Sequence, residues 1–138
     1  MAQLEANIKE KFEVIINESN EQFHNGKQKE SIVLLEEAWE LIPEPKGIYS
    51  ESYHLVEDII DTLFLLQDFN KAYEWSKKIF ITGFMRFDTG TKEFISAKAA
   101  FELGKFDLAR DFFNFAFKKS EGRCFEDEDP KYLEFFKS

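Results

Sequence analysis

The feature that most constrains the fold is a turn that recurs three times, each time between two helical patterns. The turn positions are Gly26, Gln67 and Gly104, so successive turns lie 41 and 37 residues apart. A small residue follows each turn at the fifth position and another apolar residue follows at the twelfth. These residues are Ser31, Ala72 and Ala109, then Ala38, Ile79 and Ala116. Such a period is typical of helical repeat arrays.

Apolar residues before each turn are spaced three or four apart, which places them on one face of a helix. In the first copy they are Leu4, Ile8, Phe12, Ile15 and Phe23, and the small Ser19 lies on the same face. A second helical pattern follows each turn, and Pro43 and Pro45 end the first pair. We therefore expect an all-α protein, one domain over residues 1–138, with antiparallel helix pairs at about 3–45, 48–84 and 89–120.

The C-terminal segment predicts one more short helix, at residues 129–137. Asp129 can cap it and Pro130 can occupy its first turn. Its apolar side would be Tyr132, Leu133, Phe135 and Phe136. Because terminal repeats need covering, we interpret this helix as a C-terminal cap. The alternative is a docking peptide for another chain.

The repeated pattern resembles the tetratricopeptide repeat family over roughly residues 12–120. The matching residues are Gly26, Ser31, Ala38 and Pro43, then Phe64, Phe69 and Ala72, then Ala97, Gly104, Phe106, Ala109 and Ala116. Two positions depart from the family pattern: Ile60 is bulky where a small residue is expected, and Gln67 replaces the turn glycine. The resemblance implies a right-handed stack of helix pairs whose first helices line a concave, partner-binding face.

The chain carries a net charge of −9, and this charge is unevenly distributed. Residues 1–70 hold 15 acidic and 5 basic side chains, whereas residues 71–138 hold 12 and 13. Nucleic acid is disfavoured as a partner, because phosphates require lysine and arginine. A basic protein partner, attracted by the negative field, is favoured. The alternative is that the charge serves solubility alone.

The residue pattern on the first helix of each pair predicts a protein-binding surface. Its centre would be acidic, with aromatic side chains in a deeper layer. Its residues would be Asn20, Phe23, His24, His54, Glu57, Asp58, Asp61, Phe64, Phe94, Lys98 and Phe101. Carboxylates would pair with lysine or arginine of the partner, and the phenylalanines would act as anchors. The alternative is that Phe23, Phe64 and Phe101 are core residues between helices.

Motifs for catalysis or cofactor binding are not found in the sequence, so we expect neither an enzyme nor a cofactor or metal site. His54 and Asp58 lie four residues apart, but no further histidine or cysteine completes a zinc site nearby. Cys124 is the single cysteine and cannot form an intramolecular disulfide. The start of the chain lacks a signal-type apolar core, and no apolar run would span a membrane. We therefore expect a cytoplasmic protein without a membrane partner.

Small acidic repeat proteins with an ending like FEDEDPKYLEFFKS are similar to bacterial immunity proteins. That resemblance implies a function of binding and neutralising a cognate toxin. The alternative is a tetratricopeptide-type chaperone or adaptor that holds a peptide segment of its partner. An inhibitor should bind one folded partner with strong salt dependence, and an adaptor should bind an unfolded segment with weak salt dependence.

Overall fold

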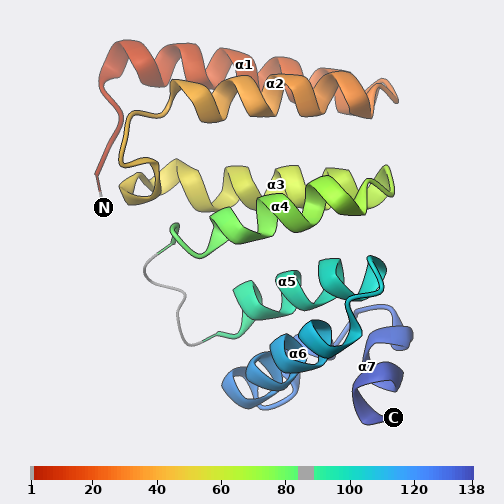
Figure 1. The fold of residues 1–138 in the computed structure, drawn as a ribbon. Helices are drawn as coiled ribbons and strands as arrows, with labels where there is room; N and C mark the ends of the chain where they lie inside the picture. The colour runs from red at the N-terminus through yellow and green to blue at the C-terminus, as the bar shows by residue number, and fades with distance from the viewer. Residues whose placement is uncertain (1, 84–88) are drawn as a thin grey trace. The chain divides into compact units, whose positions relative to one another are not determined.

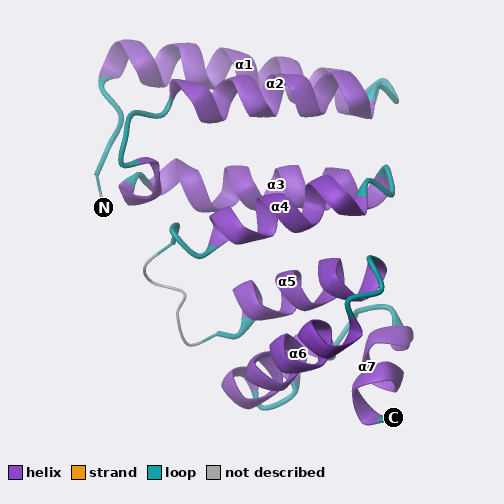
Figure 2. Ribbon diagram, in the orientation of Figure 1, coloured by secondary structure: helices purple, strands orange, loops and turns teal. Residues whose placement is uncertain are grey.

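The computed structural model of the chain describes residues 2–83 and 89–138, and in these residues it is all-α, with no strand. Figures 1 and 2 show the helices, which pack as adjacent antiparallel pairs. They are α1 (Ala6–His24), α2 (Gln28–Leu41), η1 (Lys46–Ile48), α3 (Ser50–Leu65), α4 (Phe69–Ile79), α5 (Thr91–Glu102), α6 (Phe106–Ser120), η3 (Arg123–Phe125) and α7 (Pro130–Lys137). The predicted all-α class and paired helices are confirmed.

Contacts within the chain gather into two compact units, Met1–Gly83 and Phe84–Ser138. The first unit holds two pairs, α1 with α2 and α3 with α4, and α2 also packs against α3. The second unit holds the pair α5 and α6, together with η3 and α7. The predicted end of the second repeat at residue 84 lies outside the described residues, and the prediction of a single domain stays a prediction.

The same turn closes all three pairs, as its recurrence in the sequence indicates. Gly26, Gln67 and Gly104 all adopt positive φ, at 78°, 57° and 76°. After each, one N–H donates back across the turn to a carbonyl five residues earlier, which is the Schellman arrangement of a helix C-terminus. The three bonds are Lys27 to Gln22, Asp68 to Leu63 and Lys105 to Ala100, at 2.8, 2.9 and 2.9 Å. Gln67 therefore occupies the backbone conformation that glycine occupies in the other two turns.

Small side chains let the two helices of each pair approach closely. The residues at the fifth position after each turn, Ser31, Ala72 and Ala109, are all buried. Those twelve residues earlier in the chain are buried as well: Ser19, Ile60 and Ala97. The bulky Ile60 is accommodated as a fully buried core residue within the first unit. In that unit Trp39 and Trp75 also pack edge to face, with ring centroids 5.7 Å apart.

Lysine and aspartate side chains close two helix ends in ways that the local sequence favours. Lys46 Nζ donates to the carbonyls of Trp39 and Ile42 at the C-terminus of α2, at 2.9 and 2.5 Å. A cation near the last carbonyls of a helix satisfies acceptors that have no intrahelical partner. At the start of α7 the Asp129 carboxylate accepts from the Lys131 N–H at 3.0 Å. The prediction that Asp129 is the N-cap residue of this helix is confirmed, and Pro130 occupies the first turn of α7.

Candidate protein-binding groove

Two hollows lie along α1 and α3 in the first unit, and they share Asp58. The Asp61 pocket has a volume of about 220 Å³ and is lined by Ser19, Asn20, Phe23, Ser31, Leu35, Asp58, Asp61, Thr62 and Leu65. The His54 hollow has a volume of about 300 Å³ and is lined by Phe12, Ile16, Ser50, Glu51, His54, Leu55 and Asp58. We refer to the two together as the α1–α3 groove.

The α1–α3 groove brings together five of the residues predicted from the sequence. Asn20, Phe23, Asp58 and Asp61 line the Asp61 pocket, and His54 lines the neighbouring hollow. Their spacing explains the convergence, because residues three and four apart share one helix face. The Asp61 pocket therefore combines two carboxylates and an amide with the apolar surfaces of phenylalanine and leucine.

The other predicted residues of the first unit lie outside the lining of these hollows. Glu57 accepts a hydrogen bond from Tyr53 Oη at 3.2 Å, and its carboxylate lies 3.7 Å from His54 Nδ1. Phe64 packs edge to face against Phe69, with ring centroids 5.3 Å apart. His24 is exposed and lies at the edge of the Phe23 ring.

Asp58 lies at the exposed edge of the α1–α3 groove, where its carboxyl is only partly removed from water. Its partial removal from water raises the pKa of Asp58, and the neighbouring Glu57 charge raises it further, while His54 opposes both effects. Desolvation and a like charge both disfavour the ionised form. A cation entering the groove would relieve both penalties, because it would stabilise the carboxylate.

In the second unit the predicted binding residues are covered by the chain's own C-terminal segment. Phe94 is buried, and its ring packs against Phe113, Phe125 and Tyr132 at centroid distances of 5.5, 5.1 and 6.3 Å. Phe101 is half-buried, with its ring 5.0 Å from that of Phe135 and 5.5 Å from that of Tyr132. Both phenylalanines thus contribute to an aromatic core rather than to an open surface.

Polar contacts hold the same C-terminal segment against α5 and α6. Lys98 Nζ pairs with Glu128 Oε1 at 2.9 Å, so the third predicted residue of this unit is also engaged internally. Glu102 accepts from Tyr132 Oη at 2.9 Å and pairs with Lys131 at 2.6 Å. Burial and the Glu102 carboxylate raise the pKa of Tyr132 well above its usual range. The phenol therefore stays protonated and donates.

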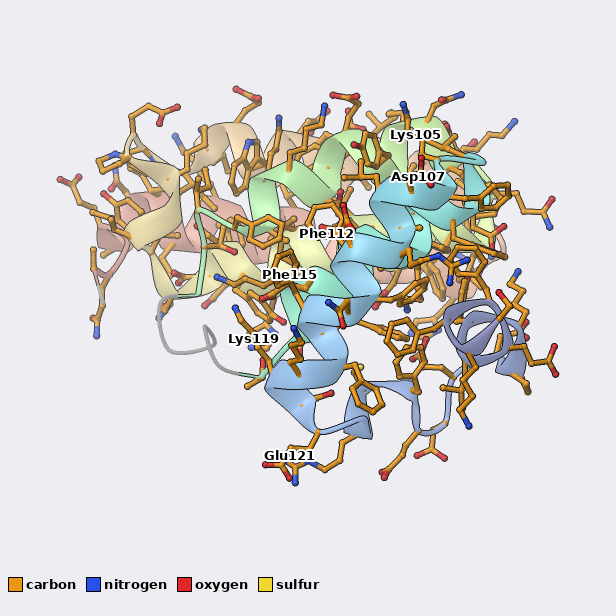
Figure 3. All side chains as sticks on the ribbon, turned by 60° about the horizontal axis from the view of Figure 1, so that its bottom comes forward. Lys105, Asp107, Phe112, Phe115, Lys119 and Glu121 are labelled. Carbon is orange, nitrogen blue, oxygen red and sulfur yellow. The ribbon has the colours of Figure 1, made fainter. Side chains whose placement is uncertain are left out.

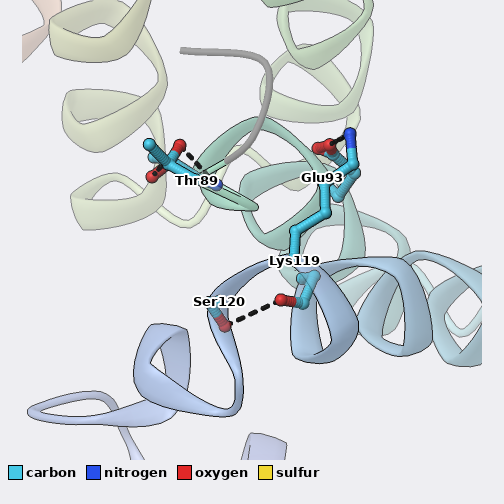
Figure 4. Close-up of polar contacts among 6 residues, drawn as sticks. Thr89, Glu93, Lys119 and Ser120 are labelled. Carbon is cyan, nitrogen blue, oxygen red and sulfur yellow. Dashed lines mark hydrogen bonds and ion pairs between the residues drawn. The ribbon is translucent and has the colours of Figure 1, made fainter.

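A polar hollow of about 440 Å³ lies at the start of α5. It is lined by Thr89, Thr91, Lys119, Ser120, Arg123 and Cys124. Figure 4 shows Lys119 reaching across to Glu93. Lys119 Nζ lies 2.6 Å from Glu93 Oε1, and the Ser120 hydroxyl donates to the Ala116 carbonyl of α6. Because its lysine is already paired with a carboxylate, this hollow is a weaker candidate site than the α1–α3 groove. Burial raises the pKa of the Cys124 thiol, which disfavours the reactive thiolate.

An apolar stripe lies along one side of α6. Leu108, Phe112 and Phe115 are spaced four and three residues apart, and Phe115 is 54% exposed. Figure 3 shows Phe112 and Phe115 on this helix, with Lys105 near its start and Lys119 near its end. The sequence reasoning treated α6 as a packing helix and did not predict this stripe.

In the Asp61 pocket, three of the five lining residues that were not predicted as binding residues carry hydroxyls, namely Ser19, Ser31 and Thr62. Ser19 and Ser31 were recognised as small packing positions, but not as polar groups beneath a pocket. Thr62 was not singled out. A signal was present for the two serines, because the equivalent positions of the third pair are Ala97 and Ala109, which carry no polar atom.

In comparisons with known proteins, no family model and no curated protein matches the chain. In the part of the chain that the structure describes, no cluster of three or more histidine, cysteine or carboxylate side chains is arranged to hold a metal ion. No helix in that part combines the length and apolar character needed to cross a bilayer.

Proposed function

We propose that the protein is a non-catalytic binding module that captures a basic protein partner in the α1–α3 groove. The observation that carries this proposal is the Asp61 pocket, where Asp58 and Asp61 lie beside Phe23 and Leu65. Carboxylates next to apolar surface suit lysine and arginine side chains, whose charged heads and hydrocarbon stems need both environments. The excess of acidic residues in residues 1–70 would accelerate the approach of such a partner.

We further propose that the helix pairs form a right-handed tetratricopeptide-like stack with α7 as its cap. The support is the repetition of one turn geometry at Gly26, Gln67 and Gly104, and of buried small residues at matching positions. In the second unit, α7 supplies the aromatic side chains that would cover a terminal repeat. In such a stack the first helices of successive pairs line one face, and the α1–α3 groove would lie on that face.

The most specific form of the proposal is an immunity protein that neutralises a cognate bacterial toxin in the cytoplasm. It rests on the similarity of this small acidic chain, and of its C-terminal segment, to bacterial immunity proteins. The charge is compatible with that function, because an acidic inhibitor can bind a basic toxin rapidly and cover its cationic site.

A second candidate function is a chaperone or adaptor that holds a peptide segment. The observation that favours it is the apolar part of the α1–α3 groove, where Phe12, Ile16 and Leu55 line the His54 hollow. An extended or helical segment could place apolar side chains there while its basic residues meet Asp58 and Asp61. For this function the apolar contacts would dominate the affinity.

Purification of the tagged protein from its native organism, followed by identification of bound proteins by mass, separates these functions. One stoichiometric basic partner encoded beside this chain, released by moderate salt, supports the immunity function. Several unrelated partners, or an unfolded segment retained in salt, support the adaptor function. A partner with no basic surface would contradict the whole proposal.

A further inference from the structure

Three buried hydroxyl groups line the Asp61 pocket, and each lies within hydrogen-bond distance of a neighbouring oxygen of the protein. Ser19 Oγ donates to the Ser31 carbonyl at 3.1 Å, and the two serine hydroxyls lie 2.7 Å apart. Either hydroxyl could donate in the hydroxyl–hydroxyl contact; the arrangement that satisfies both contacts at once has Ser19 donating to the carbonyl and Ser31 donating to Ser19. Thr62 Oγ1 donates to the Asp58 carbonyl at 2.8 Å. All three side chains are buried, at 1%, 2% and 6% exposure.

The pocket therefore presents hydrogen-bond acceptors almost exclusively. A hydroxyl has one proton and two lone pairs, so Ser31 and Thr62 keep acceptor capacity after donating. The carboxylates of Asp58 and Asp61 add further acceptors at the wall. Among the described lining side chains, the Asn20 amide is the group that still carries protons to donate. A ligand that fits this surface must supply many donors and a positive charge.

Apolar side chains line the same pocket and favour a flat cation over a compact one. Phe23 is half-buried, Leu35 is buried, and Leu65 is 66% exposed at the rim. A guanidinium group is planar, carries five N–H donors and stacks on aromatic or apolar faces, whereas an ammonium is compact and strongly hydrated. Acceptors spread over two carboxylates and three buried hydroxyls match the fork of donors on a guanidinium better than three donors on one nitrogen.

We propose that the Asp61 pocket binds the guanidinium of an arginine side chain that the protein partner inserts between α1 and α3. That the arginine belongs to a protein partner rests on the proposed function. The preference of the pocket for a guanidinium follows from its lining residues alone. The hollow of about 220 Å³ is open to solvent and gives such a side chain a direct path in.

The test uses the whole protein and a blocked arginine, N-acetyl-arginine N-methylamide, titrated while amide NMR spectra are recorded. The blocked lysine and blocked citrulline serve as comparison probes. Citrulline keeps the shape of arginine and removes its charge. We expect arginine to shift the amide signals of Asn20, Thr62 and Leu65 at lower concentration than lysine, and citrulline to leave them in place.

Two substitutions test whether the pocket carries this binding. Asp61→Asn should weaken arginine binding about tenfold, because a hydrogen bond to a charged group is lost. Asp58→Asn provides a second variant on a separate carboxylate of the same pocket. The control is Glu37→Gln, which removes one charge from an exposed position on α2 that does not line the pocket. The control should bind arginine as the natural chain does.

Three results would overturn the proposal. They are equal shifts for lysine and arginine, shifts spread over acidic residues outside the pocket, and arginine binding that survives both aspartate substitutions. Absence of any shift at Asn20, Thr62 and Leu65 would overturn it as well. Failure of the proposed function gives a different result: the protein partner would bind with unchanged affinity to variants of the groove, while the blocked arginine still bound the pocket of the natural chain.

Discussion

Ser19 Oγ lies 2.7 Å from Ser31 Oγ, and this buried contact joins α1 to α2 where the third pair has Ala97 and Ala109. The serine pair and the alanine pair differ in chemistry, but both are small enough to let the paired helices approach closely. A polar pair within a core is stabilising only while both members remain satisfied.

The serine pair predicts strong coupling between two substitutions. Ser19→Ala should lower the free energy of unfolding by about 1–3 kcal/mol, because the buried Ser31 hydroxyl loses its partner. Adding Ser31→Ala should recover most of that loss, since the pair then matches the alanines of α5 and α6. Urea denaturation of both single variants and the double variant measures the coupling. Losses that simply add would contradict the prediction.

The turn at Gln67 predicts a stabilising substitution. Its φ of 57° is unfavourable for a residue with a side chain, and glycine adopts it without that penalty. Gln67→Gly should raise the free energy of unfolding by about 1 kcal/mol, because the cost of a left-handed conformation at a residue with a Cβ is removed. The reciprocal control is Gly104→Gln, where an added Cβ meets nothing within 4 Å, so the cost is conformational. That control should destabilise by a similar amount. Thermal melting that moves in the same direction for both variants would be inconsistent with equivalent turns.

The small residues between paired helices predict a third effect on stability. Ala72→Trp and Ala109→Trp should each lower the free energy of unfolding by about 3 kcal/mol, because both alanines are fully buried where two helices meet. Matched controls are Asn70→Trp and Asn114→Trp, which add the same side chain at exposed positions of the same helices. Normal melting of both alanine variants would mean that the repeats have been aligned wrongly.

The raised pKa of Asp58 predicts a pH-dependent penalty on stability. Because its pKa in the folded chain lies above the ordinary 3.8, the folded state binds the proton more tightly than the unfolded state. Stability contributed at this site is therefore lost as pH rises from the ordinary pKa through the raised one. Asp58→Asn should be more stable than the natural chain above that window, by less than about 1 kcal/mol because the side chain is exposed to solvent.

Denaturation at a series of pH values checks this prediction. The difference between Asp58→Asn and the natural chain should vanish at low pH, where the carboxyl is protonated in both states. A natural chain that is more stable than the variant at neutral pH would show that Asp58 is stabilised by an internal partner instead.

The architecture was predictable from local signals that recur. The turn positions, the small residues at fixed distances from them, and the Asp129–Pro130 start of α7 all depend on nearby sequence, where backbone preference is decisive. The carboxylates of the α1–α3 groove were predictable for the same reason, since spacing along α3 places Asp58 and Asp61 close together.

Contacts between distant segments were not predictable in this way. Helical periodicity assigned Phe94, Lys98 and Phe101 to one face of α5, but it could not show that Tyr132 and Glu128, some thirty residues later, would cover that face. The hydroxyls of Ser19 and Ser31 in the Asp61 pocket were not predicted, because a serine at a packing position is recognised from sequence only as a small residue. Its hydrogen-bond partner is set only when two helices meet.

The central claim is that the acidic side of the α1–α3 groove binds a basic protein partner. The most direct measurement is the affinity of the purified partner for the natural chain and for a groove variant, Glu57→Lys, Asp58→Lys, Asp61→Lys. This variant reverses the two carboxylates that line the Asp61 pocket and the adjacent Glu57. A charge-matched control, Glu37→Lys, Glu40→Lys, Glu44→Lys, reverses the same number of charges outside the groove. We predict an intact helical fold in both variants, with affinity at least about 100-fold weaker for the groove variant than for the control. Equal affinity of the two variants would show that the partner does not bind in the α1–α3 groove.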